Sequence, residues 1–288
     1  CNSLVDRIVP GKPETALKES IENKLGYSDD LLIMSEVYRL WAIEGGADVA
    51  DVLSFAQADK GVVIAKDINL FRELKLRLLN GTHTLSSGVA FLSGIDTVKN
   101  AMDDRQVQHY ISKVMQSEIA VAIPYNTTPE QTNEFSVNCL DRFRNPYINH
   151  LWLSITMQYS SKMRMRVLPV LRNYYSLFNS VPEYMATGFA AYIYFMKAVK
   201  EENGTYFGKL KGNFYPIQDD KAFYFYEKWQ TVKPEMIAAS VLRDTSLWGS
   251  DLSYLPGFAE SVQEKINEIE ELGMAAVIDP LQSNKSIA

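Results

Sequence analysis

The chain has 288 residues, of which 47% are hydrophobic and 22% are charged. These proportions are those of an ordinary globular protein and exclude a disordered or fibrous chain. The 29 Lys and Arg residues against 35 Asp and Glu residues give a formal net charge of −6. This charge argues against a nucleic-acid or anionic-membrane partner, because either partner needs a broad basic face. A small-molecule partner is the better expectation.

The cysteine and histidine content argues against disulfides and metals. The two cysteines, Cys1 and Cys139, form no disulfide framework and no Cys-x-x-Cys pair, so a reducing cytoplasm is the expected location. The histidines are not spaced with other ligands as in a metal site, and no metal is expected. No apolar run approaches the roughly 18 to 20 residues of a membrane helix. Because the chain opens at Cys1 without a signal peptide, we expect it to be an internal part of a longer protein.

Residues 1–66 are predicted to be β-rich. Short β-compatible runs are separated there by clusters of Gly, Pro and Asp: Leu4–Val5, Leu31–Met34, Val37–Ile43 and Val62–Ala65. These strands are too few for a sheet domain of their own. We therefore expect them to complete a sheet whose other strands lie outside this chain.

Residues 67–288 are predicted to form a mainly α-helical domain. Asp67 is the expected N-cap of a first helix, Ile68–Leu79, and Thr128 with Pro129 has the cap-then-proline pattern of another helix start. The other predicted helices are Arg105–Ile123, Pro146–Tyr159, Pro169–Phe178, Pro182–Val199, Asp220–Gln230, Pro234–Leu242 and Phe258–Leu272.

The segment from Phe71 to Ser86 carries polar side chains among leucines. At about 100° per residue, an α-helix places four polar side chains on one apolar face: Lys75, Thr82, His83 and Ser86. Asn80 falls about 140° from Lys75 on the same wheel. Three other side chains lie on the opposite side and are predicted to face water: Glu73, Arg77 and Thr84. A buried polar stripe costs several kcal/mol unless it is satisfied, so it is typical of an active site.

The same segment also has a purely structural interpretation. Lys75 could extend to water along the leucines, and Asn80–Gly81 could be a helix-ending turn. His83 could be a hydrogen-bonded core histidine. Spacing alone leaves both interpretations open.

Four segments resemble those of a known enzyme family. The spacing of Lys75, Asn80 and His83 resembles the signature of the polyol-specific long-chain dehydrogenases, the mannitol dehydrogenase family. Three further segments resemble other motifs of that family: Asn2–Pro13, Glu36–Glu44 and Arg142–Pro146. Within the family, the amino-acid sequences of Ser3–Pro13 and Leu78–Thr84 are most similar to those of members that reduce sugar acids of the hexuronate class.

The resemblance implies a two-domain enzyme. An N-terminal Rossmann domain would bind NAD, and a multi-helical C-terminal domain, like that of 6-phosphogluconate dehydrogenase, would supply the catalytic residues. This chain would be the C-terminal portion, with residues 1–66 linking to the Rossmann domain and residues 67–288 forming the helical domain. Since the cofactor glycines cannot be assigned here, the chain alone is expected neither to bind NAD nor to be active.

The resemblance also implies roles for particular residues. Lys75 matches the family's catalytic lysine, and Asn80 and His83 match groups that contact the reacting oxygen. Asp6 and Arg7 are expected near the domain junction, where Asp6 could contact the nicotinamide or orient Lys75. A structural role for these two residues is equally open.

A sugar acid also needs a receptor for its carboxylate. Lys162 and Arg166 are four residues apart, so they could clamp one anion from one helix face while Arg164 points away. A solvated basic face is an equally open interpretation. Asn145 and His150 are weaker candidates for substrate binding. Two other cations are next in line: Arg142 and Arg172.

Two alternative functions remain open at this point. Another member of the same family, either a reductase of a different hexuronate or a polyol dehydrogenase, would share the lysine, asparagine and histidine. A non-catalytic helical module would instead bind a partner through an aromatic surface, for which the run Phe223–Tyr226 is the candidate.

Overall fold

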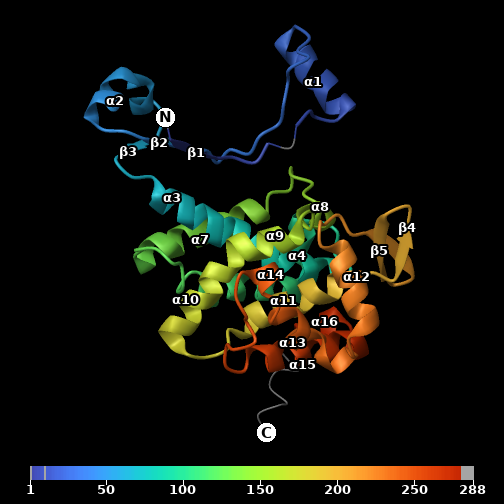
Figure 1. Ribbon diagram of the computed structural model, residues 1–288. Coiled ribbons are helices and arrows are strands. Elements are labelled where there is room, and N and C mark those ends of the chain that lie inside the picture. The colour runs from blue at the N-terminus through green and yellow to red at the C-terminus, as the bar shows by residue number, and fades with distance from the viewer. Residues whose placement is uncertain (1, 10, 280–288) are drawn as a thin grey trace. The chain divides into compact units, whose positions relative to one another are not determined.

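The computed structural model describes residues 2–9 and 11–279 and is mainly α-helical. The chain forms two compact units. The first comprises Cys1–Arg72 with Asn145–His150, and the second comprises Glu73–Arg144 with Leu151–Ala288. The predicted class, a helical domain preceded by a few short strands, is confirmed (Figure 1).

The first unit is built on a small sheet. Its strands are β1 (Ser3–Asp6), β2 (Leu40–Glu44) and β3 (Val62–Ala65), in the order β1-β2-β3. β1 pairs antiparallel with β2, while β3 pairs parallel with β2. A parallel pair needs a crossover connection, which α2 (Ala47–Val52) and the 3₁₀ turn η1 (Ser54–Gln57) supply.

The first unit differs from the sequence prediction in two places. The predicted strand Leu31–Met34 does not form, since Met34 makes only an isolated bridge to Gly11 and Leu31 is 85% exposed. The helix α1 (Thr15–Leu25) was not predicted. None of its residues is buried, yet Leu17, Ile21 and Leu25 are four residues apart, which is a local signal of a helix.

The second unit contains most of the helices. After α3 (Asn69–Leu74), which contains the boundary between the units, they are α4 (Thr82–Leu92), α5 (Val98–Asp103), α6 (Arg105–Lys113), α7 (Pro129–Phe143), α8 (Trp152–Ile155), α9 (Tyr159–Lys162), α10 (Leu168–Phe178), α11 (Glu183–Phe195), α12 (Ala222–Thr231), α13 (Ile237–Leu242), α14 (Thr245–Trp248), α15 (Phe258–Leu272) and α16 (Met274–Val277). A 3₁₀ turn, η5 (Pro234–Met236), precedes α13. Three segments are π-helical: η2 (Lys75–Gly81), η3 (Val114–Ile119) and η4 (Met163–Val167).

Helices α4 and α11 form the centre of this unit, and Figure 1 shows them inside the other helices. Ten of the eleven residues of α4 are buried. The two helices approach closely at glycines. A Cβ on Gly88 would lie 3.1 Å from the carbonyl carbon and oxygen of Ala191, and a Cβ on Gly188 would lie 2.6 Å from Leu85 Cδ2. Helix α15 packs on α11, with the rings of Phe189 and Phe258 5.1 Å apart.

Several helix predictions are confirmed. Asp67 Oδ1 accepts the backbone N–H of Asn69 at 2.7 Å, where α3 begins. Thr128 caps α7 through a capping box with Gln131, which satisfies two otherwise unpaired N–H groups. The predicted helix Phe258–Leu272 is α15, residue for residue.

The predicted helix Pro146–Tyr159 is wrong. Asn145 Oδ1 accepts the N–H of Tyr147 at 3.0 Å, which closes a local turn instead of starting a helix. Leu151 then bridges to Thr97, and Trp152 donates its N–H to Asp96. These contacts keep the chain extended, so a helix begins only with α8.

A second sheet follows α11, whereas the sequence predicted a helix through Val199 and no strands after it. Strands β4 (Lys200–Glu202), β5 (Thr205–Leu210) and β6 (Asn213–Pro216) form an antiparallel meander. The first turn is Asn203–Gly204, with φ of 52° and 79°. This pair favours a two-residue hairpin turn because both positions need positive φ. The signal was therefore present in the sequence.

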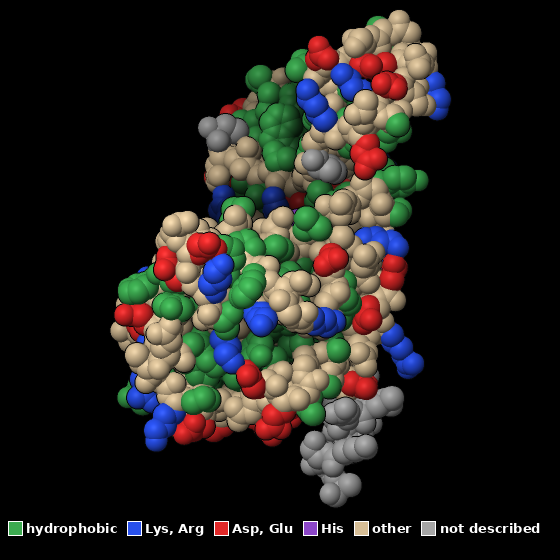
Figure 2. Space-filling view, turned by 90° about the vertical axis from the view of Figure 1, so that its right-hand side faces the viewer, with side chains coloured by type: hydrophobic (Ala, Val, Ile, Leu, Met, Phe, Trp, Pro, Cys, Tyr) green, Lys and Arg blue, Asp and Glu red, His purple; other side chains and the backbone are tan. Residues whose placement is uncertain are grey.

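Within the residues described, no helix combines the length and the apolar character needed to cross a membrane. On the face drawn in Figure 2, Lys and Arg side chains are interspersed with Asp and Glu side chains over the helical unit.

Candidate active site

Lys75 and Asn80 lie on one turn of a π-helix. The segment η2 continues from α3 and leads into α4. Hydrogen bonds of a π-helix join residues five apart, so the residue five positions after Lys75 returns to the same side of the helix. The α-helical wheel, which separated Asn80 from Lys75 by about 140°, was therefore wrong. π-helical turns are rare and occur frequently at functional sites.

His83 follows one turn later, in α4, and is 7% exposed. Its ring stacks on Phe143 with centroids 4.2 Å apart and an interplanar angle of 15°. The ring of Trp152 is nearly perpendicular to the imidazole, with centroids 5.9 Å apart and an interplanar angle of 78°. Phe143 ends α7, and Trp152 begins α8. These rings fix the orientation of the imidazole, so the packing role and a site role are compatible.

Arg77 and Thr84 were predicted to face water, and this prediction is wrong. Arg77 is 7% exposed, and its guanidinium donates to Met165 O at 2.6 Å and to Arg166 O at 3.0 Å. It also pairs with Glu73, N to O 2.8 Å. Thr84 is fully buried. The α-helical wheel failed because the π turn shifts the phase of every later residue, and because η4 packs on this side of η2.

Thr84 connects the motif to one of the predicted cations. Its hydroxyl donates to Asn80 O at 2.7 Å and accepts from Arg166 Nη1 at 3.2 Å. The chain Arg166, Thr84, Asn80 thus joins η4 to η2 through side-chain hydrogen bonds. Neither Thr84 nor Arg77 was among the sequence-predicted site residues.

The second predicted cation, Lys162, ends α9 next to η4. Its Nζ donates to Ile155 O at 2.9 Å. Burial lowers the pKa of Lys162, and the charge of Arg166 lowers it further, against the opposite effect of Asp219. Burial also lowers the pKa of Arg166. Arg164, in contrast, is exposed as expected. Two half-buried cations that lie close together favour an anionic ligand, because an anion relieves their repulsion.

Two other hydroxyl groups near the motif are buried without a hydrogen-bond partner among the described residues. These are Thr82 Oγ1 and Ser86 Oγ. They are four residues apart on α4 and thus lie on one side of it. Both were predicted on the Lys75 face. Buried polar atoms are paired in most proteins, so this side of α4 can accept further hydrogen bonds.

The remaining predicted residues are distributed over both units. Asp6, Asn145 and His150 belong to the first unit, where Asp6 is 2% exposed and Asn145 closes the turn to Tyr147. Two reserve cations belong to the second unit: Arg142, which is buried in α7, and Arg172, which donates to Ser250.

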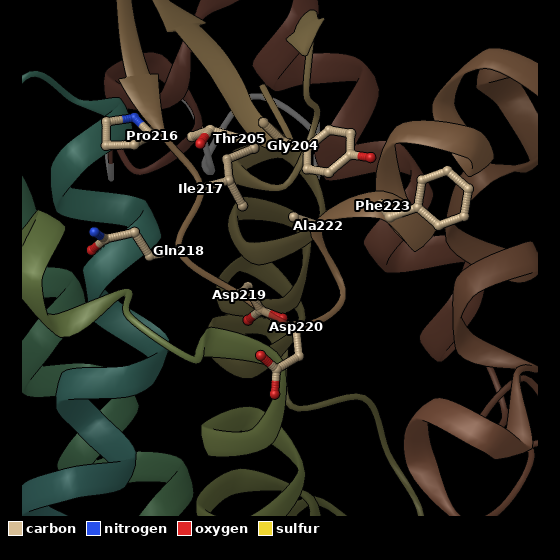
Figure 3. Close-up of a pocket in the computed structure, with 10 residues that line it drawn as sticks. Gly204, Thr205, Pro216, Ile217, Gln218, Asp219, Asp220, Ala222 and Phe223 are labelled. Carbon is tan, nitrogen blue, oxygen red and sulfur yellow. The ribbon is translucent and has the colours of Figure 1, made fainter. Parts of the chain in front are cut away.

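A separate cavity of about 350 Å³ lies where β5 and β6 meet the start of α12. Figure 3 shows the carboxylates of Asp219 and Asp220 close together below Ala222, with the ring of Phe223 pointing away from them. Asp219 is already engaged by the N–H and hydroxyl of Ser160. None of the predicted site residues lines this cavity.

The described residues do not fit two kinds of cofactor site. They contain no group of three or more His, Cys, Asp or Glu placed to hold a metal ion. The strands β1, β2 and β3 are also not followed by the Gly-x-Gly-x-x-Gly turn that cradles a dinucleotide pyrophosphate.

Comparison with known proteins identifies the class of this chain. The sequence profile of the mannitol dehydrogenase C-terminal domain matches residues 67–270. The chain therefore belongs to the mannitol dehydrogenase family, which confirms the resemblance inferred from the motifs.

Among individual relatives, altronate oxidoreductase of Bacillus subtilis (strain 168) is 36% identical over 283 residues, covering 97% of this chain and 55% of that protein. Altronate oxidoreductase of Yersinia pestis is 36% identical over 286 residues, covering 96% of this chain and 56% of that protein. The chain thus spans about half the length of the curated relatives it matches.

Two known structures share the fold. Pseudomonas fluorescens mannitol 2-dehydrogenase, in a ternary complex with NAD and D-mannitol, aligns with a TM-score of 0.75 and 21% identity, over 98% of this chain and 54% of that chain. D-sorbitol dehydrogenase in its substrate-free form aligns with a TM-score of 0.70 and 19% identity, over 96% of this chain and 54% of that chain.

Proposed function

We propose that this chain is the C-terminal, substrate-binding part of an NAD-dependent sugar-acid dehydrogenase that interconverts D-tagaturonate and D-altronate in hexuronate breakdown. The similarity to altronate oxidoreductases supports the substrate class. The observation that carries the proposal is the link between two groups of residues. The Asn80 carbonyl accepts from Thr84, which accepts from Arg166, so the turn that carries the proposed proton donor is hydrogen-bonded to the proposed carboxylate receptor.

In this proposal, Lys75 is the general acid. A ketone that receives hydride develops negative charge on its oxygen, which must be protonated and stabilised. The Lys75 ammonium donates that proton, and the Asn80 side-chain amide donates a hydrogen bond to the same oxygen. The His83 ring, which packs against Phe143 and Trp152, orients a substrate hydroxyl.

Arg166 and Lys162 bind the substrate carboxylate. The Arg166 guanidinium uses one nitrogen on Thr84, which leaves further N–H donors for a carboxylate. The charge of Lys162 adds to the attraction. Asn145 and His150 are assigned to the rest of the sugar chain as secondary contacts.

NAD is assigned to a domain outside these residues, because the described strands lack the phosphate-binding turn. The greater length of the relatives supports such an N-terminal Rossmann domain as the partner of this chain. Residues 1–66 would link to that domain, with Asp6 near the nicotinamide, and residues 67–288 would hold the substrate. Bound NAD would supply the hydride.

The test is an assay of the full-length protein with NADH and three ketoses: tagaturonate, fructuronate and fructose. We expect tagaturonate to give the highest kcat/KM. General acid catalysis contributes about 10²- to 10⁴-fold, so Lys75→Ala should lower kcat by that factor. The control Lys113→Ala, at an exposed lysine of α6, should change nothing. Preference for fructose would indicate a polyol dehydrogenase, and absence of NADH oxidation with all three would refute the proposed function.

A further inference from the structure

Arg77 is a buried cation that the proposed mechanism does not use. It lies in η2 between Lys75 and Asn80. Its Nε contacts Glu73 Oε2 at 2.8 Å, and its Nη1 donates to the carbonyls of Met165 and Arg166. A buried guanidinium that donates to backbone carbonyls of a distant segment connects the two segments by charge-assisted hydrogen bonds.

Arg77 reaches η4 where the π-helical segment passes into α10. Pro169 stands in the first turn of α10, and since proline has no N–H, this junction has one backbone donor fewer than an uninterrupted helix. Arg77 Nη1 adds a donor there, 2.6 Å from the Met165 carbonyl.

A second hydrogen-bonded connection starts from η4. The side chain of Arg166 donates to Thr84, which in turn donates to Asn80 O. Gly81 lies between the segments, where an added Cβ would be 3.7 Å from Arg166 O. Arg77 of η2 thus donates to backbone carbonyls of η4. Arg166 of η4 donates to Thr84 of α4, which is hydrogen-bonded to η2.

We propose that Arg77 is a positioning residue that fixes the distance between the Lys75–Asn80 turn and the Lys162–Arg166 cation pair. It touches no substrate itself. It selects acid substrates by holding the cations where a carboxylate reaches them while the ketone lies at Lys75. This inference rests on the proposed function for the identity of the ligand, whereas the mechanical link between η2 and η4 does not depend on it.

The kinetic test uses the full-length enzyme with Arg77→Met, Arg77→Lys and the control Arg164→Met. This control removes an exposed arginine from η4, the segment to which Arg77 donates. Loss of one charge-assisted hydrogen bond corresponds to about 10-fold or more. Arg77→Met should raise KM for tagaturonate by at least about that factor, while KM and kcat for fructose change little. Arg77→Lys should recover part of the loss, because ammonium can still donate to one carbonyl. Equal losses on both substrates would refute positioning.

Hydrogen exchange tests the connection between η2 and η4 without an enzyme assay. Its result therefore does not depend on the proposed function. In Arg77→Lys, amides of residues 75–84 and 163–168 should exchange faster together, whereas α15 should be unchanged. Faster exchange in only one of the two segments, or in the whole unit, would overturn the inference. Because this measurement uses Arg77→Lys, it decides the inference even if Arg77→Met does not fold. If wild-type protein uses no sugar acid but both segments loosen together, the proposed function fails and the link stands.

Discussion

Glu118 is a buried carboxyl that should make the stability of the helical unit depend on pH. It lies in η3, is 5% exposed, and accepts the backbone N–H groups of Tyr184 and Met185 at 2.8 and 2.6 Å. Those are the second and third residues of α11, so Glu118 caps that helix from another part of the chain. Burial raises the pKa of Glu118 to about 8, although the two N–H bonds oppose the shift.

The size of the pH effect on stability follows from the difference in the pKa of Glu118 between the folded and the unfolded protein. An unfolded glutamate ionises near pH 4.5, whereas folded Glu118 does so near 8. Because the pKa is higher in the folded state, the stabilisation is complete below about pH 4.5 and is lost as pH rises through 8. Each pH unit in this window costs the folded state about 1.4 kcal/mol. The free energy of unfolding should therefore fall by about 5 kcal/mol across it.

The assay is urea unfolding of wild type and Glu118→Gln at several pH values from 5 to 8, followed by tryptophan fluorescence. Glutamine cannot ionise and can accept only one of the two N–H groups, so the variant should be less stable at pH 5 and approach or exceed wild type at pH 8. The control Glu264→Gln changes an exposed residue of α15 and should follow wild type. Parallel pH curves for wild type and Glu118→Gln would refute the reasoning.

Three further outcomes are expected. Gly88→Ala should lower the free energy of unfolding by about 1 to 3 kcal/mol, and more than Gly188→Ala, because its methyl group would meet backbone of α11 and not a movable leucine; equal melting temperatures would contradict this order. Gly204→Ala should destabilise the β4–β5 hairpin by about 1 kcal/mol, since φ is +79° there, as measured by proteolysis of that turn. Arg166→Gln should lower kcat/KM for tagaturonate about 10- to 150-fold with little effect on fructose, and an equal loss on both would assign Arg166 a structural role only.

Local sequence determined a large part of the secondary structure. The cap at Thr128 and the helix Phe258–Leu272 were predicted correctly because capping groups and an apolar stripe are local signals. The Lys75, Asn80 and His83 motif was also identified from sequence, since its spacing resembles a family signature. Membership of that family is confirmed by the match over residues 67–270.

The errors arose where distant contacts outweigh local preference. The segment after Asn145 has helix-compatible residues, but the bridge of Leu151 to Thr97 keeps it extended. The Asn203–Gly204 turn is different, because the pair itself is a local signal of a hairpin, and the β4–β5 hairpin was predictable from sequence.

The arrangement of the candidate site was decided by tertiary structure. No sequence pattern marks a π turn, because the extra residue is accommodated only where neighbouring segments, here η3 and η4, pack against it. That turn brings Asn80 to the side of Lys75 and turns Arg77 inward. Arg77 has an exposed position on an α-helical wheel, yet it is buried because Met165 and Arg166, almost ninety residues later, present carbonyls to it. Local sequence determines which side chains are available, and long-range packing determines which of them meet.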